Sequence, residues 1–337
     1  MFNKDNFDQY YYGHGKLLLS SEYFVLDGAK GLAIPTKVGQ EMGVNYKGSG
    51  GEKLHWKSYN DNNELWFEST FDLWHFNIID GEESKEALLL QKLLRQSRAQ
   101  NKHFLREDVN VDVVTKLGFP LNWGLGSSSS LIYNISQWAY ISPFELLFKS
   151  YGGSGYDIAC AQSSGPIVYT KNNTGPYWAP VEFNPVFKDN LYFLYLGQKQ
   201  DSTSAINFYR SLHIDKKSDI VKKLSKLTNQ MISCTNAMDF SYILDEHENI
   251  ISNSMGIPKV QDRLFKDFSG NIKSLGAWGG DFALILSKQS PEETRNYFND
   301  KGFNILLTYD HLILSCENFY DTEKNMQSQE EQYHEFE

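Results

Sequence analysis

The eight residues from Trp123 to Ser130, with the sequence WGLGSSSS, constrain this chain more than any other segment. Two glycines flank one leucine, four serines follow, and a helical pattern begins at Leu131. Glycine adopts left-handed backbone conformations and lets the backbone approach a ligand closely. A helix behind such a loop directs its free N–H groups and its positive dipole end into the loop. The segment is typical of a phosphate-binding loop, although it lacks the lysine of a Walker A motif and is also compatible with a serine-rich helix cap.

Two further glycine-containing segments accompany this loop, at residues 15–28 near the N-terminus and 274–282 near the C-terminus. The first begins Gly15-Lys16 and continues through Ser21-Glu22, and the second reads SLGAWGGDF. In this order, the three segments resemble the GHMP kinases, which include galactokinase, homoserine kinase, mevalonate kinase and phosphomevalonate kinase. Members of that family carry a Gly-Lys-hydrophobic-Gly-Glu segment, then Gly-Leu-Gly-Ser-Ser, then a late glycine-rich loop. The resemblance extends from about residue 13 to about residue 315, which is nearly the whole chain.

The resemblance implies an ATP- and Mg²⁺-dependent kinase with an α+β, two-domain GHMP kinase fold. The expected parts are an N-terminal ATP-binding α/β domain with a left-handed βαβ crossover (1–175), a C-terminal ferredoxin-like domain (176–316) and an acidic tail (317–337). A chain of 337 residues has room for two domains. Connector-like residues between Lys171 and Pro180 place the domain boundary there.

Composition restricts the environment and the partners of the protein. No apolar run reaches the roughly 18 residues of a membrane-spanning helix, and the polar N-terminus does not resemble a signal peptide. The three cysteines are far apart and form neither a disulfide framework nor a metal-binding pattern, so we expect a cytoplasmic protein, monomeric or homodimeric. The net charge of −10 argues against nucleic acid as a partner. The expected partner is a small-molecule substrate, and no membrane partner is expected.

Hydrophobic periodicity predicts the main elements. Residues 54–71 alternate as half-buried strands do, and residues 109–113 predict another strand that leads into the glycine loop. A helix is predicted over 85–101, with Arg95 and Arg98 in its last turns, where cations favour the helix dipole. Residues 17–19 and 23–26 look like short strands around a turn.

Asp157 is the main catalytic candidate, in the segment GSGYDIA. In phosphoryl transfer a carboxylate can accept the proton of the acceptor hydroxyl, although an aspartate at a helix start can also be only a cap. The segment resembles the Ser-Gly-aromatic-Asp stretch of phosphomevalonate kinases more closely than the stretch of mevalonate kinases. In those families the matching aspartate is the base.

Lys16 is the second catalytic candidate, because the family places the matching lysine in the active site. There it lowers the pKa of the acceptor hydroxyl or balances the charge of the transferred phosphoryl group. The alternative is a lysine on the solvated face of a strand. For ATP, the resemblance implies contacts with Gly124, Leu125, Gly126, Ser127, Ser128, Ser129, Gly276, Gly279 and Gly280. For the substrate, it implies Lys16, Glu22, Ser154, Gly155, Tyr156, Ser202 and Thr203.

Mg²⁺ prefers carboxylate, hydroxyl and phosphate oxygens, so Ser128 and Glu145 are its expected ligands. Glu145 lies twelve residues before Asp157, a distance similar to that in mevalonate kinases, but a surface residue in a first helical turn explains it equally well. The acceptor favoured by the motifs is 5-phosphomevalonate, with mevalonate as the alternative. Trp278 and Asp281 stand where the family usually keeps small residues, so a non-catalytic nucleotide-binding relative is a further hypothesis. A related decarboxylase is disfavoured, because its Ser-Gly-Ser-Ala stretch is missing.

Overall fold

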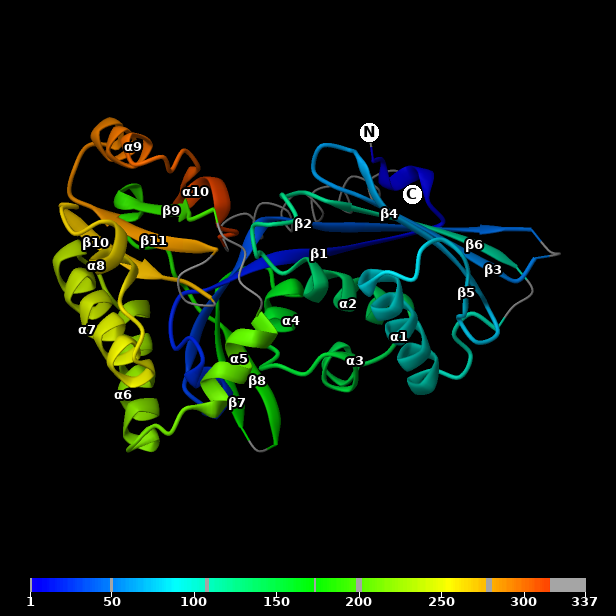
Figure 1. Ribbon diagram of the computed structural model, residues 1–337, viewed down its shortest axis with the longest axis horizontal. Coiled ribbons are helices and arrows are strands. Elements are labelled where there is room, and N and C mark those ends of the chain that lie inside the picture. Colours follow the sequence, from blue (N-terminus) through cyan, green and yellow to red (C-terminus); the bar gives the residue numbers. More distant parts are fainter. Residues whose placement is uncertain are drawn as a thin grey trace, which may run out of the picture. The chain divides into compact units, whose positions relative to one another are not determined.

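The computed structural model describes residues 2–48, 51–106, 109–172, 174–197, 202–276 and 281–315 (Figure 1). Within these residues the chain forms two compact units. The first unit comprises residues up to 16, residues 38–162 and a short piece that ends at residue 206. The second unit comprises residues 17–37, 163–198 and 207 onward.

The division into units differs from the single boundary expected at residue 175. Strands β1 (Gln9–Leu18) and β2 (Gly31–Lys47) each contribute residues to both units, so the chain passes between the units several times. Composition marks loops and linkers, but it does not mark a transition inside a continuous strand. The expected acidic tail at 317–337 lies outside the described residues.

The first unit is built on a mixed β-sheet. Its strands lie in the order β5-β4-β3-β6-β2, and β1 also pairs with β2. Strand β3 runs parallel to β6, with Trp56 opposite Val113, while β6 runs antiparallel to β2, with Val113 opposite Val44. The remaining bounds are β3 Lys53–Tyr59, β4 Leu65–Asp72, β5 Ile78–Asp80 and β6 Asn110–Leu117.

Helices cover one face of this sheet (Figure 1). Helix α1 contributes Leu90, Leu93 and Leu94 to the core, at the spacing that places side chains on one side of a helix. Ile132 and Ile135 of α2 join the same buried cluster. The helices are α1 Lys85–Gln100, α2 Ser127–Trp138, α3 Pro143–Ser150 and α4 Tyr156–Ala161. The glycine loop connects the end of β6 to the start of α2. Because α2 contacts α4, this loop lies near α4.

The second unit contains an antiparallel sheet in the order β10-β11-β9-β12, and a further ladder in which β7 pairs with the start of β2 and with β8. The strands are β7 Ile167–Asn172, β8 Gly175–Pro180, β9 Leu191–Tyr195, β10 Gly270–Ser274, β11 Phe282–Ser287 and β12 Leu306–Thr308. The helices are α6 Lys217–Ile232, α7 Ala237–Met255, α8 Val260–Leu264, α9 Pro291–Asp300 and α10 Tyr309–Leu312, while α5 (Ser202–Ser211) has residues in both units. Short 3-10 helices cover Lys4–Asn6 (η1), Phe24–Asp27 (η2) and Lys188–Asn190 (η3).

Two predicted elements are wrong. The strand expected at 23–26 is replaced by the 3-10 helix η2 (Phe24–Asp27), because positive φ values at Ser21 and Tyr23 (63° and 62°) interrupt an extended chain. The expected connector at 171–180 contains the edge strand β8, which tolerates Pro176 and Pro180 because an edge strand need not donate every N–H group to a ladder.

None of the helices in the ranges given above is both long enough and apolar enough to cross a membrane.

Candidate active site

The glycine loop has the backbone geometry that its sequence predicts. Gly124 and Gly126 both have positive φ values, 67° and 90°, in the region that favours glycine. Gly126 is the N-cap residue of α2, and it has no side chain with which to bond the first N–H groups of the helix. The positive end of α2 is therefore left for an external anion, a donor set that suits the phosphates of a nucleotide.

The four serines after the loop have different environments. Ser127 is half-buried and Ser128 is exposed, so both lie at the accessible start of α2. Ser130 is fully buried and donates to the side chain of Gln40, which fixes α2 against the sheet. Ser129 is also buried, and its hydroxyl donates to Oδ2 of Asp157 at 2.6 Å. Ser129 was expected to contact ATP, but its side chain is already engaged by the catalytic candidate.

Asp157 lies in the first turn of α4, and the cap of that helix is Gly155, with φ 98°. The simple interpretation of Asp157 as an N-cap is therefore wrong, because the capping position belongs to a residue without a side chain. The carboxylate is half-buried and oriented by the Ser129 hydroxyl. This arrangement leaves lone pairs of the carboxylate for a proton from another group.

Lys16 is held by the glycine loop itself. Its backbone N–H donates to the carbonyl of Leu125 at 2.9 Å, and its ammonium donates to the carbonyl of Gly124 at 2.8 Å. The ammonium also lies over the ring of Tyr156, 5.7 Å from the ring centre. The structure thus brings Lys16, Tyr156 and Asp157 together around one loop, all within the first unit.

Burial and nearby charges keep the Tyr156 hydroxyl and the Cys160 thiol neutral. Burial raises the pKa of Tyr156 to about 12, the positive charge of Lys16 lowers it, and the negative charge of Asp157 raises it. Burial, together with the charge of Asp157, also raises the pKa of the Cys160 thiol. Near neutral pH both groups keep their protons, so neither competes with Asp157 as a base, and Cys160 is no nucleophile.

Gly126 offers a direct test of this packing, because a Cβ added there would lie 3.0 Å from Cγ of Lys16. We expect Gly126→Ala to destabilise the fold by about 1–2 kcal/mol through backbone strain and to displace Lys16, lowering turnover by ten-fold or more, as ~1 Å shifts do. The matched control is Gly152→Ala, since Gly152 has a similar φ of 82° but nothing within 4 Å of its added Cβ. Urea denaturation and turnover should show similar strain in both variants, with loss of activity in Gly126→Ala alone. Equal activity in the two variants would contradict the packing role of Gly126.

The two expected magnesium ligands, Ser128 and Glu145, do not contact each other among the contacts that the structure shows. Glu145 stands in the first turn of α3 and pairs with Lys149, one turn along the same helix, and both side chains are half-exposed. This is the environment of a surface residue in a first helical turn. Ser128 is exposed at the start of α2. Among the residues that the structure describes, no group of three or more His, Cys, Asp or Glu side chains is placed to hold a metal.

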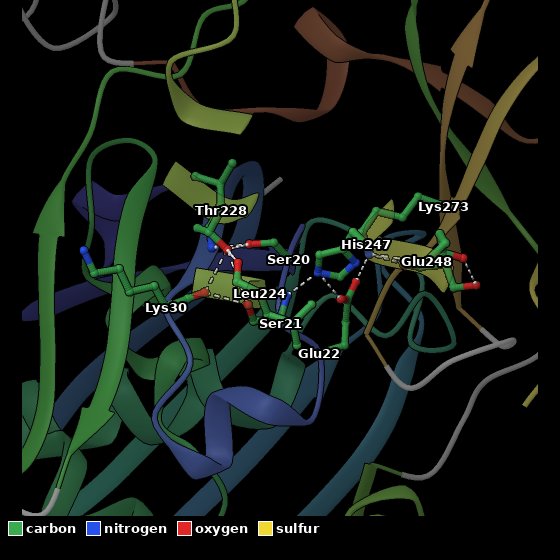
Figure 2. A network of polar contacts seen from close by, with 11 residues as sticks. Ser20, Ser21, Glu22, Lys30, Leu224, Thr228, His247, Glu248 and Lys273 are labelled. Carbon is green, nitrogen blue, oxygen red and sulfur yellow. Dashed lines mark hydrogen bonds and ion pairs between the residues drawn. The ribbon is translucent and has the colours of Figure 1, made fainter. Parts of the chain in front are cut away.

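Glu22, expected beside the substrate, is fully buried in the second unit. Its carboxylate accepts a hydrogen bond from the ammonium of Lys273, another fully buried side chain (Figure 2). A carboxylate without solvent exposure is not accessible to a ligand. Glu22 is therefore not in the position of a substrate contact, which the resemblance implied. Ser21 stands where the GHMP kinase motif carries a glycine, and its positive φ of 63° lies in the region that favours glycine.

Ser21 is held by its neighbours in this unusual conformation. Its hydroxyl donates to the carbonyl of Lys30 at 2.6 Å, and its N–H donates to Nε2 of His247 at 2.8 Å. An acceptor role for Nε2 requires a neutral imidazole, and burial, together with the charge of Lys273, lowers the pKa of His247 well below its usual value. Thr228 also donates to the carbonyl of Lys30, at 2.8 Å.

Glu248 completes the buried cluster, and its titration should be visible in the stability of the protein. Burial and the charge of Glu22 raise its pKa to about 7, while Lys273 and Ser274 lower it. Between pH 4.5 and 7 the folded state therefore holds the extra proton, so this group's contribution to stability falls as pH rises through that window. As pH rises from 4.5 to 7, we expect the free energy of unfolding of Glu248→Gln to increase relative to that of wild type by on the order of 3 kcal/mol. Urea denaturation at several pH values measures this, with the exposed neighbour variant Glu246→Gln as the matched control. A difference between Glu248→Gln and wild type that does not change with pH would exclude the buried titration.

The remaining expected site residues are placed less completely. Ser154 is buried beside Gly155 in the loop before α4, in the first unit. Ser202 and Thr203 begin helix α5, but their side chains are not described. Gly276 follows β10 and has the positive φ of 63° expected of a glycine loop. Gly279, Gly280 and Trp278 lie outside the described residues.

Comparisons with known proteins identify the fold. No family model matches the sequence. No curated protein matches it either. Among solved structures, the mevalonate kinase of Methanococcus jannaschii superposes with a TM-score of 0.66 at 14% identity, covering 91% of this chain and 98% of that one.

Two other structures with the same architecture carry bound ligands. A Streptococcus pneumoniae phosphomevalonate kinase in complex with phosphomevalonate and AMPPNP gives a TM-score of 0.64 at 15% identity, covering 89% of this chain and 99% of that one. A Lactococcus lactis galactokinase complexed with galactose gives 0.62 at 14% identity, covering 91% and 94%. The α+β chain therefore has the fold of the GHMP kinases, the family that its three sequence motifs resemble.

Proposed function

We propose that this protein is an ATP-dependent kinase that phosphorylates a small molecule. The observation that carries the proposal is that one glycine loop in the first unit holds both catalytic candidates. Lys16 donates to the carbonyl of Gly124, and Asp157 accepts from Ser129 in the helix that begins at Gly126. An anion site, a cation and a carboxylate in one place are the parts that phosphoryl transfer requires.

The residues that would hold ATP are those at the start of α2. The N–H groups behind Gly126 and the hydroxyls of Ser127 and Ser128 suit its phosphates. When bound, ATP supplies the transferred phosphoryl group and Mg²⁺ offsets its negative charge. We retain Ser128 and Glu145 as candidate Mg²⁺ ligands, although Glu145 would first have to leave Lys149.

The protein's own groups manage the proton and the charge. Asp157 accepts the proton of the acceptor's nucleophilic oxygen, and the hydrogen bond from Ser129 fixes which oxygen of the carboxylate is free to do so. Lys16 contributes a positive charge that the backbone carbonyl of Gly124 holds in place. Tyr156 keeps its proton and packs under the ammonium, which limits the positions that Lys16 can occupy.

The proposed acceptor is 5-phosphomevalonate, with mevalonate as the alternative. The segment Gly155-Tyr156-Asp157 supports the first choice, because it resembles the corresponding stretch of phosphomevalonate kinases. Ser154, Ser202 and Thr203 are proposed to contact the acceptor. Glu22 is not proposed as a contact, since both its environment and its pairing with Lys273 keep it away from solvent. A nucleotide-binding relative without catalysis is the second hypothesis, favoured by Asp281 next to the second glycine loop.

A coupled assay of ADP release tests the proposal, with 5-phosphomevalonate, mevalonate and galactose offered side by side. Turnover with 5-phosphomevalonate alone supports the proposal as stated, and turnover with another acceptor corrects the substrate but keeps the kinase. Nucleotide binding without turnover for any acceptor would favour the non-catalytic hypothesis.

A further inference from the structure

Helix α2 carries both the anion-binding end of the candidate site and the serine that orients Asp157. Its apolar side chains Ile132, Ile135 and Trp138 lie in the core of the first unit. Apolar contacts are non-directional, so they do not by themselves fix how far a helix is rotated about its axis or shifted along it. Hydrogen bonds between α2 and the sheet can supply that precision, because they need a defined distance and angle.

Two side chains of α2 donate hydrogen bonds to the same residue of strand β2. The hydroxyl of Ser130 donates to Oε1 of Gln40 at 3.0 Å, and the side-chain amide of Asn134 donates to the backbone carbonyl of Gln40 at 2.9 Å. Ser130 and Asn134 are four residues apart, so they lie on the same face of the helix. Both are fully buried and Gln40 is only 4% exposed, so water does not compete for these bonds and the low local dielectric strengthens them.

Gly13 sets how closely α2 approaches the neighbouring strand β1. A Cβ added at Gly13 would lie 3.0 Å from the carbonyl oxygen of Ser130 and 3.1 Å from its Cα, which is closer than side-chain carbons normally approach. Glycine therefore permits a distance between β1 and the first turn of α2 that a larger residue would increase. Gly13 and Gln40 thus hold the same residue, Ser130, from two adjacent strands.

The contact of Ser130 with the sheet also determines the direction of Ser129. Successive residues of an α-helix are about 100° apart around its axis, since there are 3.6 residues per turn. With Ser130 directed at β2, Ser129 is directed at α4, where its hydroxyl donates to Oδ2 of Asp157 at 2.6 Å. A rotation or shift of α2 that broke the bond to Gln40 would displace the Ser129 hydroxyl by a similar amount.

We propose that Gly13, Gln40 and Ser130 are positioning residues for the catalytic step. They hold α2 at the place where Ser129 can orient the carboxylate of Asp157, and they touch none of the reacting groups. The inference rests on the proposed kinase function, in which this carboxylate accepts the proton of the acceptor. It deepens that function by naming the buried contacts within the first unit that orient the base.

Ser130→Ala is the first test, because it removes the bond to Gln40 without adding volume. It should lower kcat about ten-fold, since a displacement of ~1 Å can cost 10²-fold and a smaller displacement is expected here. The KM values for ATP and for the acceptor should change by less than about three-fold, because an orienting contact of the base acts on the chemical step.

Ser136→Ala is the matched control for this variant. Ser136 is another fully buried serine of α2, but its hydroxyl donates within the helix, to the carbonyl of Tyr133 at 2.7 Å. Its replacement should keep kcat within about two-fold of wild type, because the contact with the sheet stays intact. Urea denaturation of both variants shows whether kcat follows the position of α2 or the stability of the fold.

Gly13→Ala tests the same contact from the strand. Its added methyl group should displace α2 by a few tenths of an ångström, and we expect kcat to fall by about three- to ten-fold. Gly31→Ala is the matched control, because its added Cβ would lie 3.2 Å from the carbonyl oxygen of Ser20, an equally close contact in the second unit. It should leave kcat unchanged.

A combined variant identifies the route of the effect. If Ser130 acts through Ser129, then Ser130→Ala should lower kcat by less than about two-fold in a protein that already carries Ser129→Ala. The reason is that the bond to Asp157, which Ser130 positions, is already absent there. Fully additive effects would mean that Ser130 acts on the fold and not on the base, and would overturn the proposal.

The outcomes separate this inference from the kinase function on which it rests. An active wild type together with an unchanged kcat in Ser130→Ala would overturn the inference alone. A loss of kcat in Ser136→Ala or Gly31→Ala, in proportion to the loss of stability, would also overturn it alone. A wild type that transfers phosphate to none of the acceptors offered would overturn both proposals.

Discussion

Asp157→Asn should lower kcat by a factor of about 10²–10⁴, the usual contribution of a general base. Asparagine has the shape of aspartate and can still accept the hydrogen bond from Ser129, so the loop and α4 should stay in place. It cannot take a proton from the nucleophilic oxygen of the acceptor. The KM for ATP should therefore remain close to the wild-type value, which steady-state kinetics will measure for both substrates.

The same chemical change elsewhere in the unit provides the control. Asp80 is exposed at the end of β5, and Asp80→Asn should leave kcat unchanged. Ser129→Ala should have an intermediate effect, because the Asp157 carboxylate would remain but lose its orienting partner. Near-normal turnover in Asp157→Asn would rule out the assignment of this residue as the base.

Arg98→Met should lower the free energy of unfolding by about 3–5 kcal/mol, since it leaves buried carbonyl groups without donors. The Arg98 guanidinium is buried, and it lies 4.0 Å from the centre of the Phe76 ring. Burial also lowers its pKa, to about 10, so it stays charged at neutral pH. It donates to four backbone carbonyls, those of Leu73, Trp74, Phe104 and Leu105.

Arg95→Met is the matched control for this prediction. Arg95 lies one turn earlier on α1, is exposed, and donates to the carbonyl of His75 and the side chain of Asn77. An exposed arginine contributes little, so we expect a loss below about 1 kcal/mol. Urea-denaturation midpoints of the two variants measure the difference. Similar midpoints would show that the carbonyl contacts of Arg98 contribute no more than an ordinary surface interaction.

Arg98 also shows the limit of sequence analysis for charged residues. Its position in the last turn of a helix predicts an exposed side chain that favours the helix dipole, a role that fits Arg95 better. Its actual partners, residues 73–74 and 104–105, come from segments on either side of α1. Nothing in the local sequence indicates that these carbonyls converge on one side chain.

Local sequence patterns predict the elements whose structure depends on residues close together in the sequence. The alternation of Val111 and Val113 predicts β6 correctly, and the leucine spacing predicts α1. The glycine loop before α2 was also predictable, because glycine is the residue that tolerates the positive φ values found at Gly124 and Gly126. The similarity of fold to known kinases then agrees with the order of the three motifs.

Partners distant in the sequence were not predictable. Lys16 and Gly124 are more than 100 residues apart, as are Glu22 and Lys273, and each contact depends on how the strands pair. Glu22 resembles a site residue in sequence, yet burial and Lys273 give it another environment. His247 and Glu248 were missed altogether, because an acidic and a basic residue on a helix usually indicate a solvated face. A weak signal existed in Ser21, where a serine in place of a family glycine implies a backbone that needs additional support.

Direct detection of the phosphorylated product tests the kinase proposal most directly. The protein is incubated with Mg²⁺ and ATP labelled in its γ-phosphate, with 5-phosphomevalonate and mevalonate in separate reactions, and the products are separated and identified by mass. We predict one labelled acceptor that carries a single additional phosphoryl group, formed in equal amount to ADP and formed about 10²–10⁴ times more slowly with Asp157→Asn. Label that remains in ATP, or that appears only as inorganic phosphate, would contradict the proposal that this fold catalyses phosphoryl transfer to either acceptor.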